Sequence, residues 1–170
     1  MQPLKTIAAS VLPVIAALLI AGQRRQQPLE LPFELDLAAR PPAFVELPGF
    51  SGAEPWGRWT DGVEAKLVLP RRLPACLELE LEARAFGPNV GQLVTIQGGE
   101  STVQIAFSAE LESRRVMLCG LRGARELRLR PARPTSPRSL GQSQDARQLG
   151  IGVARISLRA LPLAVSELRR

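Results

Sequence analysis

The stretch LPACLELELEARAF, residues 73–86, alternates apolar and polar side chains along almost its whole length. In an extended chain successive side chains point to opposite faces, so the leucines and alanines of this stretch fall on one face. A helix would scatter the leucines around its circumference, although leucine and glutamate both favour helices. The pattern therefore predicts a half-buried β-strand with Glu78, Glu80 and Glu82 on its solvent face.

Similar short runs recur between residues 49 and 161, separated by turn residues, and GG at 98–99 is typical of a hairpin. None of this region shows the period of an amphipathic helix. We therefore predict an all-β domain over 49–161, an antiparallel β-sandwich of the jelly-roll kind. Its further strands are expected within residues 63–70, 93–97, 101–110, 114–121, 124–132 and 151–161.

The segment 23–48 differs from the domain that follows it. It holds five prolines from Pro28 to Pro48 and has no helical period. We expect an extended lead-in with one or two short edge strands, such as LPFELDL at 31–37. Residues 162–170 are expected to form a tail.

The amino terminus contains an uncharged apolar run of 17 residues, TIAASVLPVIAALLIAG at 6–22. This is near the lower limit of roughly 17 residues for a transmembrane helix, and longer than the 7–15 or so of a cleaved signal core. We favour an N-terminal transmembrane helix that acts as a signal anchor over a removed signal peptide. Both alternatives predict export of the domain.

Charge divides the chain into two unequal parts. Residues 23–113 carry 8 Arg and Lys against 13 Asp and Glu, a net −5, whereas 114–170 carry 13 against 3, a net +10. No basic stretch is interleaved with aromatic residues, so we expect no nucleic acid partner. We expect instead that Arg128 and Arg130 pair across strands with the glutamates of 78–82.

Catalysis and metal binding find little support in the composition. The chain has no histidine, which removes Ser-His and Cys-His nucleophiles and the usual zinc ligand sets. We therefore predict no enzyme activity, no metal and no cofactor. Cys76 and Cys119 either form one disulfide in an oxidising compartment or remain two thiols, and their spacing does not decide.

Both tryptophans of the chain lie in GFSGAEPWGRWTDG, residues 49–62. Aromatic faces beside planar polar groups are the components of a saccharide site. If 56–60 is extended, Trp56 and Arg58 share one side while Trp59 and Asp61 share the other, and the two rings point apart. The alternative is that the stretch serves mainly to pack the fold.

Three runs carry a family resemblance: GFSGAEPWGRWTDGVEAKLVLP, LELELEARAFGPNVGQ and RPTSPRSLGQSQDARQLGIGVARISL. They contain E-x-W-G-x-W, A-R-A-F-G-P-N-x-G-Q and S-P-x-x-L-G-x-S-x-D-x-R-x-L-G-I-G. Over residues 49–158 the chain resembles the C-terminal β-sandwich of bacterial phosphoglycerol transferases, which modify periplasmic glucans. Similar modules occur on some membrane glycosyltransferases of the cell envelope. The resemblance does not include the catalytic sulfatase-like domain.

The same motifs add loop residues to the candidate ligand site. Structural roles are equally open: Asn89 can take a left-handed conformation in the turn 87–91, and Asp145 and Arg147 can pair with each other or with Arg58 and Glu54. The candidate ligand-binding residues are Glu54, Trp56, Arg58, Trp59, Asp61, Asn89, Gln92, Asp145 and Arg147.

Anchor, fold and resemblance together lead to one expected function. We expect a single-pass protein of the bacterial inner membrane, held through residues 6–22, with its C-terminal domain in the periplasm. It would be a non-catalytic accessory domain that binds an envelope polysaccharide or glucan, or docks a membrane glycosyltransferase or phosphoglycerol transferase. The alternative is a ligand-free assembly protein, which predicts that Trp56 and Trp59 are both buried.

Overall fold

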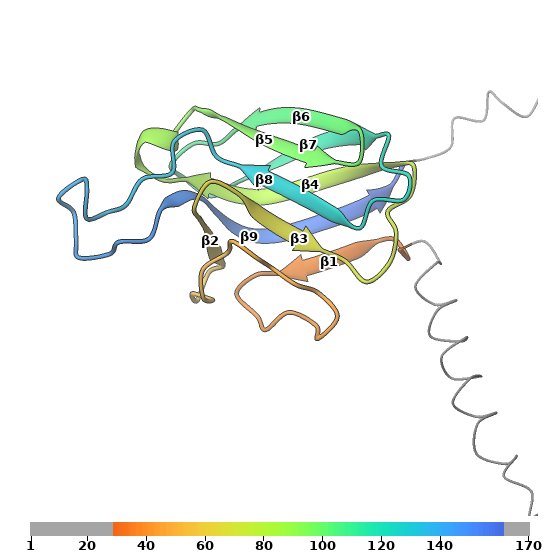
Figure 1. Ribbon diagram of the computed structural model, residues 1–170, viewed down its shortest axis with the longest axis horizontal. Helices are drawn as coiled ribbons and strands as arrows, with labels where there is room; N and C mark the ends of the chain where they lie inside the picture. Colours follow the sequence, from red (N-terminus) through yellow and green to blue (C-terminus); the bar gives the residue numbers. More distant parts are fainter. Residues whose placement is uncertain (1–28, 162–170) are drawn as a thin grey trace, which may run out of the picture.

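Two antiparallel sheets lie face to face in the computed structural model, which describes residues 29–161 (Figure 1). The predicted all-β antiparallel sandwich is therefore confirmed, while its description as a jelly roll stays a prediction. The helix predicted over 6–22 lies outside the described residues. Within residues 29–161, no helix has the length and apolar character needed to cross a bilayer.

The first sheet has five strands in the order β1-β9-β4-β7, with β2 also paired to β9. β1 and β2 occupy successive lengths of the same β9 edge, since Phe33 pairs with Leu158 and Arg58 with Val153. The strands are β1 (Phe33–Asp36), β2 (Arg58–Asp61), β4 (Cys76–Ala85), β7 (Glu112–Cys119) and β9 (Leu149–Ala160).

The second sheet has four strands in the order β3-β8-β5-β6. A short 3₁₀ turn, η1 (Gly87–Asn89), leads from β4 of the first sheet to β5 of the second. The predicted hairpin joins β5 and β6, but its turn consists of Gly99 and Glu100 rather than residues 98–99, because Gly98 pairs with Ser101. The strands are β3 (Ala65–Val68), β5 (Leu93–Gly98), β6 (Ser101–Ala106) and β8 (Glu126–Arg130).

The core lies between the two sheets and follows the alternation of the sequence. Every second residue of β4 is buried from Leu77 onward, and the residues between them are partly exposed. Leu35, Leu37 and Val45 join the same core, which therefore reaches into the segment predicted as a lead-in. Burying each such side chain stabilises the fold by about 1.5–3 kcal/mol.

One predicted pairing is wrong. The glutamates of β4 do not face Arg128 and Arg130, because β4 and β8 lie in different sheets. Glu80 instead pairs with Arg115 of β7 and Arg159 of β9. An exposed ion pair contributes only about 0–1 kcal/mol, so burial of the apolar faces, rather than charge, decides which strands are neighbours.

Cys76 and Cys119 are register partners on β4 and β7 and form a disulfide. The alternative of two thiols is thereby excluded in this structure. The bond joins positions 43 residues apart and ties the edge strand β7 to the centre of its sheet.

The described chain begins and ends at one end of the sandwich, and the turn before β2, the loop after β4 and the long loop 131–148 lie at the other (Figure 1). Pairings along the strands agree with this view. Leu29 donates its N–H to the carbonyl of Arg72, and Ala160 pairs with Leu77. At the opposite end Phe86 donates its N–H to the carbonyl of Gly150.

Candidate functional site

A tight turn places the first tryptophan. The N–H and C=O groups of Glu54 and Gly57 exchange two hydrogen bonds, which leaves Pro55 and Trp56 at the tip of the turn. Gly57 has a φ of 153°, and a Cβ there would lie 2.2 Å from the carbonyl oxygen of Val153. A side chain at position 57 would therefore push β2 away from β9.

The two tryptophan rings contact each other, so the prediction that they point apart is wrong. Their centroids lie 5.0 Å apart with 72° between the ring planes. The turn reverses the chain before Trp59, so the two residues do not belong to one extended run. Trp59 is buried and also meets the ring of Phe86 at 5.8 Å, whereas Trp56 is half-buried.

Gly152 of β9 makes room for both rings. A Cβ at this position would lie 2.3 Å from Cη2 of Trp56 and 2.9 Å from Cε3 of Trp59. The strand beneath the rings therefore has no side chain at the point of contact, and the rings lie directly on its backbone.

Arg84 also contacts the two tryptophan rings, and the sequence patterns did not indicate this residue. Its Cζ lies 4.0 Å from the centroid of the Trp56 ring and 5.1 Å from that of Trp59, a cation–π geometry. The alternation of 73–86 puts Arg84 on the polar face, but only the pairing of Arg84 with Gly152 brings it to the rings. Its Nε is buried and has no hydrogen-bond partner among the described residues.

A chain of hydrogen bonds links the turn to the loop 131–148. The indole N–H of Trp56 donates to Oε2 of Glu54 at 3.1 Å, and Nη1 of Arg147 donates to Oε1 of the same carboxylate at 3.0 Å. Arg147 also donates to Asp145, through Nη2 at 2.6 Å and Nε at 2.9 Å. These bonds lower the pKa of Asp145 and raise the pKa of Arg147.

Arg58 and Asp61 form hydrogen bonds with the backbone of neighbouring segments. Arg58 donates through Nε to the carbonyl of Leu37 and through Nη1 to that of Ser51, so it fastens the lead-in rather than joining the rings. Asp61 accepts the backbone N–H of Gln148 at 2.7 Å and so holds the end of the loop that carries Arg147.

Asn89 has a structural role. Its side chain is fully buried, donates to the carbonyls of Phe86 and Arg133, and accepts the N–H of Arg133. The predicted left-handed conformation is wrong, because among residues 29–161 only glycines have positive φ, here Gly87 and Gly91. Gln92 is exposed, and its backbone N–H bonds to the carbonyl of Asn89.

The structure thus brings five of the nine predicted residues together and adds Arg84. We call this group the tryptophan cluster: Glu54, Trp56, Trp59, Arg84, Asp145 and Arg147. Its two carboxylates and two guanidinium groups sum to zero charge. Across the described part of the chain, no three His, Cys, Asp or Glu side chains are grouped so that they could hold a metal ion.

A family model described as "Domain of unknown function (DUF7024)" matches residues 24–160. The chain belongs to the DUF7024 family. Over 132 residues this DUF7024 chain is 28% identical to phosphoglycerol transferase I of Citrobacter koseri and 27% identical to that of Salmonella paratyphi B. Each match covers 74% of this chain and 17% of the transferase. The resemblance to a domain of phosphoglycerol transferases is confirmed, and it concerns a small part of those enzymes.

Two solved structures resemble the DUF7024 chain at 9–11% identity. BiXyn10A CBM1 in its apo form gives a TM-score of 0.49, covering 78% of this chain and 100% of its own. A ruminal GH26 endo-beta-1,4-mannanase gives a TM-score of 0.47, covering 81% of this chain and 27% of its own.

Proposed function

We propose that this DUF7024 chain is a non-catalytic accessory domain of bacterial envelope glycan modification, and that it binds saccharide at the tryptophan cluster. The observation that carries the proposal is the similarity of the chain to a part of phosphoglycerol transferase I that makes up 17% of that enzyme. We further propose that residues 6–22 anchor it in the inner membrane with the sandwich in the periplasm. The Cys76–Cys119 disulfide supports an oxidising compartment.

The cluster has groups suited to sugar recognition. The half-buried indole of Trp56 offers an aromatic surface for the apolar face of a sugar ring. Glu54, Asp145 and Arg147 have side chains between 25% and 36% exposed, so their unused lone pairs and N–H groups are within reach of hydroxyls. Their mutual bonds fix these groups before binding, which lowers the entropy lost on association. Zero net charge favours neutral hydroxyls over anionic substituents.

Tryptophan fluorescence tests this proposal. The full chain in detergent micelles would be titrated with periplasmic glucans and with exopolysaccharide fragments. A saturable change in emission is expected, and it should disappear in Glu54→Gln, which keeps the shape of the side chain but loses the charge that holds Arg147. Glu100→Gln, the same exchange at an exposed position outside the predicted ligand set, is the matched control and should titrate like the parent chain.

A second candidate function has an observation in its favour. Arg84 covers part of the Trp56 ring, and Glu54, Asp145 and Arg147 already pair with one another, as expected of a clamp that orders loops. In that case the domain docks a membrane glycosyltransferase or phosphoglycerol transferase without a sugar ligand. Emission insensitive to every saccharide, together with crosslinking of the anchored chain to such an enzyme, would favour this role over saccharide binding.

A further inference from the structure

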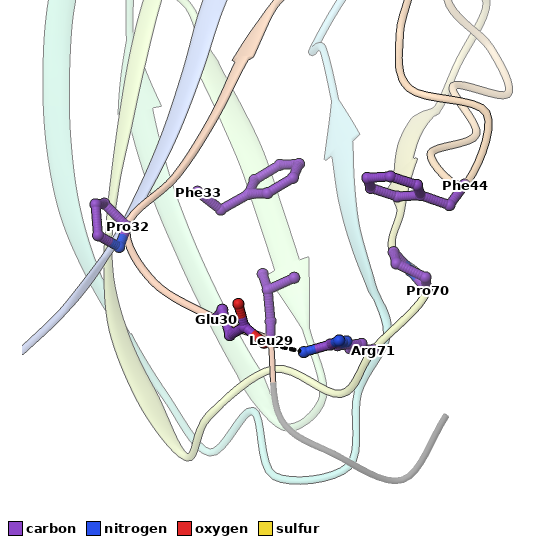
Figure 2. Close-up of a pocket in the computed structure, with 7 residues that line it drawn as sticks. All are labelled: Leu29, Glu30, Pro32, Phe33, Phe44, Pro70 and Arg71. Carbon is purple, nitrogen blue, oxygen red and sulfur yellow. Dashed lines mark hydrogen bonds and ion pairs between the residues drawn. The ribbon is translucent and has the colours of Figure 1, made fainter. Parts of the chain in front are cut away.

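A second feature of the molecule lies away from the tryptophan cluster. It is an apolar hollow of about 590 Å³ at the end of the sandwich where the described chain begins (Figure 2). The lining comes from the segment around β1, the loop before β2 and the loop after β3. It consists of Leu29, Glu30, Pro32, Phe33, Phe44, Pro70 and Arg71.

The hollow exposes more apolar surface than a single stray side chain would. Phe33 and Phe44 face each other across it, with Leu29 and Pro70 beside them (Figure 2). Phe44 is 57% exposed, and Phe33 is half-buried. Single exposed apolar residues are ordinary, but several gathered in one hollow indicate a surface that binds something.

The position of the hollow in the sequence limits what can reach it. Leu29 lines it, and only residues 23–28 separate Leu29 from the apolar run 6–22. Six residues span at most roughly 20 Å even when fully extended. If 6–22 crosses a bilayer, the hollow is held within that distance of the membrane surface.

Charge around the hollow suits an anionic surface. Arg71 and Arg72 follow Pro70, and Arg72 is exposed. Glu30 is the acidic residue of the lining and pairs with Arg71 at 2.6 Å. Arginines beside exposed phenylalanines are the combination that binds the interface of a bilayer with anionic lipids.

We propose that this hollow docks on the surface of an anionic phospholipid bilayer, with Phe44 entering the interface. The inference rests on the anchoring of residues 6–22 that is part of the proposed function. It adds to the proposed function an orientation of the domain relative to the membrane. Phe33 pairs with Leu158, six residues along β9 from Gly152 beneath the tryptophan rings, which is about 20 Å of strand. The tryptophan cluster then faces away from the membrane.

Depth-dependent quenching tests this orientation with the full chain. The protein would be reconstituted into vesicles of phosphatidylethanolamine and phosphatidylglycerol, with and without brominated acyl chains. Phe44→Trp places a probe in the hollow, and Val63→Trp is the matched control, because Val63 is 78% exposed on the loop between β2 and β3. Pro70→Trp is a second probe of the hollow. Flotation of the vesicles reports anchoring separately.

We expect the chain to float with the vesicles and the probes at 44 and 70 to be quenched at least two-fold more than the probe at 63. A floating chain with equal quenching at all three positions overturns the docking but leaves the proposed function intact. A chain that does not float overturns the anchoring and the docking together. Emission at 44 that shifts with protein concentration in detergent would assign the hollow to a second copy, and so contradict the proposal.

Discussion

The guanidinium of Arg84 lies 4.0 Å from the centroid of the Trp56 ring, above the point where Gly152 leaves the neighbouring strand without a side chain. Three segments far apart in the sequence, the turn 54–57, β4 and β9, therefore meet at one aromatic ring. The contacts at this ring suggest direct tests of stability.

Replacing Arg84 by methionine keeps most of the side-chain volume and removes the charge above the ring. Cation–π contacts of this kind contribute about 0.5–2 kcal/mol, so we expect Arg84→Met to lower the free energy of unfolding by about 1 kcal/mol. Urea unfolding followed by far-ultraviolet circular dichroism measures the change. Arg122→Met, at an exposed position, is the control, and equal losses in both variants would contradict a specific ring contact.

Gly152→Ala tests how closely the rings approach β9. The added Cβ would lie 2.3 Å from Trp56, so the ring must move or the strands separate. We expect a loss of about 1–3 kcal/mol and a red shift of the tryptophan emission. Gly52→Ala is the control, because nothing lies within 4 Å of a Cβ there. Unchanged emission in Gly152→Ala would show that the rings do not lie on this strand.

Asn89 and Gln92 both belong to the predicted set of ligand-binding residues, but only Asn89 is expected to stabilise the fold. Asn89→Ala removes the hydrogen bonds of a fully buried side chain, including the one that accepts the N–H of Arg133, so a loss of about 1–3 kcal/mol is expected. Gln92→Ala changes an exposed side chain, and the expected effect on stability is under about 0.5 kcal/mol. Thermal unfolding of both variants measures the difference, and an Asn89→Ala variant as stable as Gln92→Ala would contradict the structural role of Asn89.

The Cys76–Cys119 disulfide is expected to stabilise the fold by restricting the unfolded chain. Closing a loop across 43 residues restricts the unfolded ensemble by about 4 kcal/mol in the chain-entropy model. We expect the Cys76→Ala and Cys119→Ala double variant to lose about 3–4 kcal/mol. Dithiothreitol should destabilise the parent chain by a similar amount and leave the double variant unchanged. If dithiothreitol lowered the stability of the parent chain and of the double variant equally, the disulfide could not be the cause of that loss.

Acid should loosen the loop that carries Asp145. The hydrogen bonds from Arg147 hold the pKa of Asp145 below its usual value, so the ionised form is favoured in the folded state. Its contribution is present above the ordinary pKa of an aspartate and is lost as pH falls through the lower, folded value. Unfolding free energies from about pH 5 to pH 2.5 should fall more steeply for the parent than for Asp145→Asn. If the unfolding free energies of the parent and of Asp145→Asn fell in parallel, Asp145 would not contribute to the acid sensitivity.

The strands could be read from the sequence because their signal is local. Alternation in 73–86 fixes which residues of β4 are buried, and Gly98 and Gly99 indicate the hairpin between β5 and β6 to within one residue. The motifs around Trp56 and Asp145 were also sufficient to name the family resemblance, since they are carried by short runs. Within the candidate site, the selection of Glu54, Trp56, Trp59, Asp145 and Arg147 followed from the same runs.

The tertiary structure determined which strands and side chains lie opposite one another. Alternation places Arg84 on a polar face and gives no indication that Gly152 lies opposite, because that depends on the register between β4 and β9. Glu80 of β4 meets Arg115 and Arg159 rather than Arg128, because burial of apolar surface outweighs exposed charge pairs in choosing neighbours. The sequence by itself determined the strands and the residue types of the site. Packing of the two sheets determined their partners, since those contacts join residues distant along the chain.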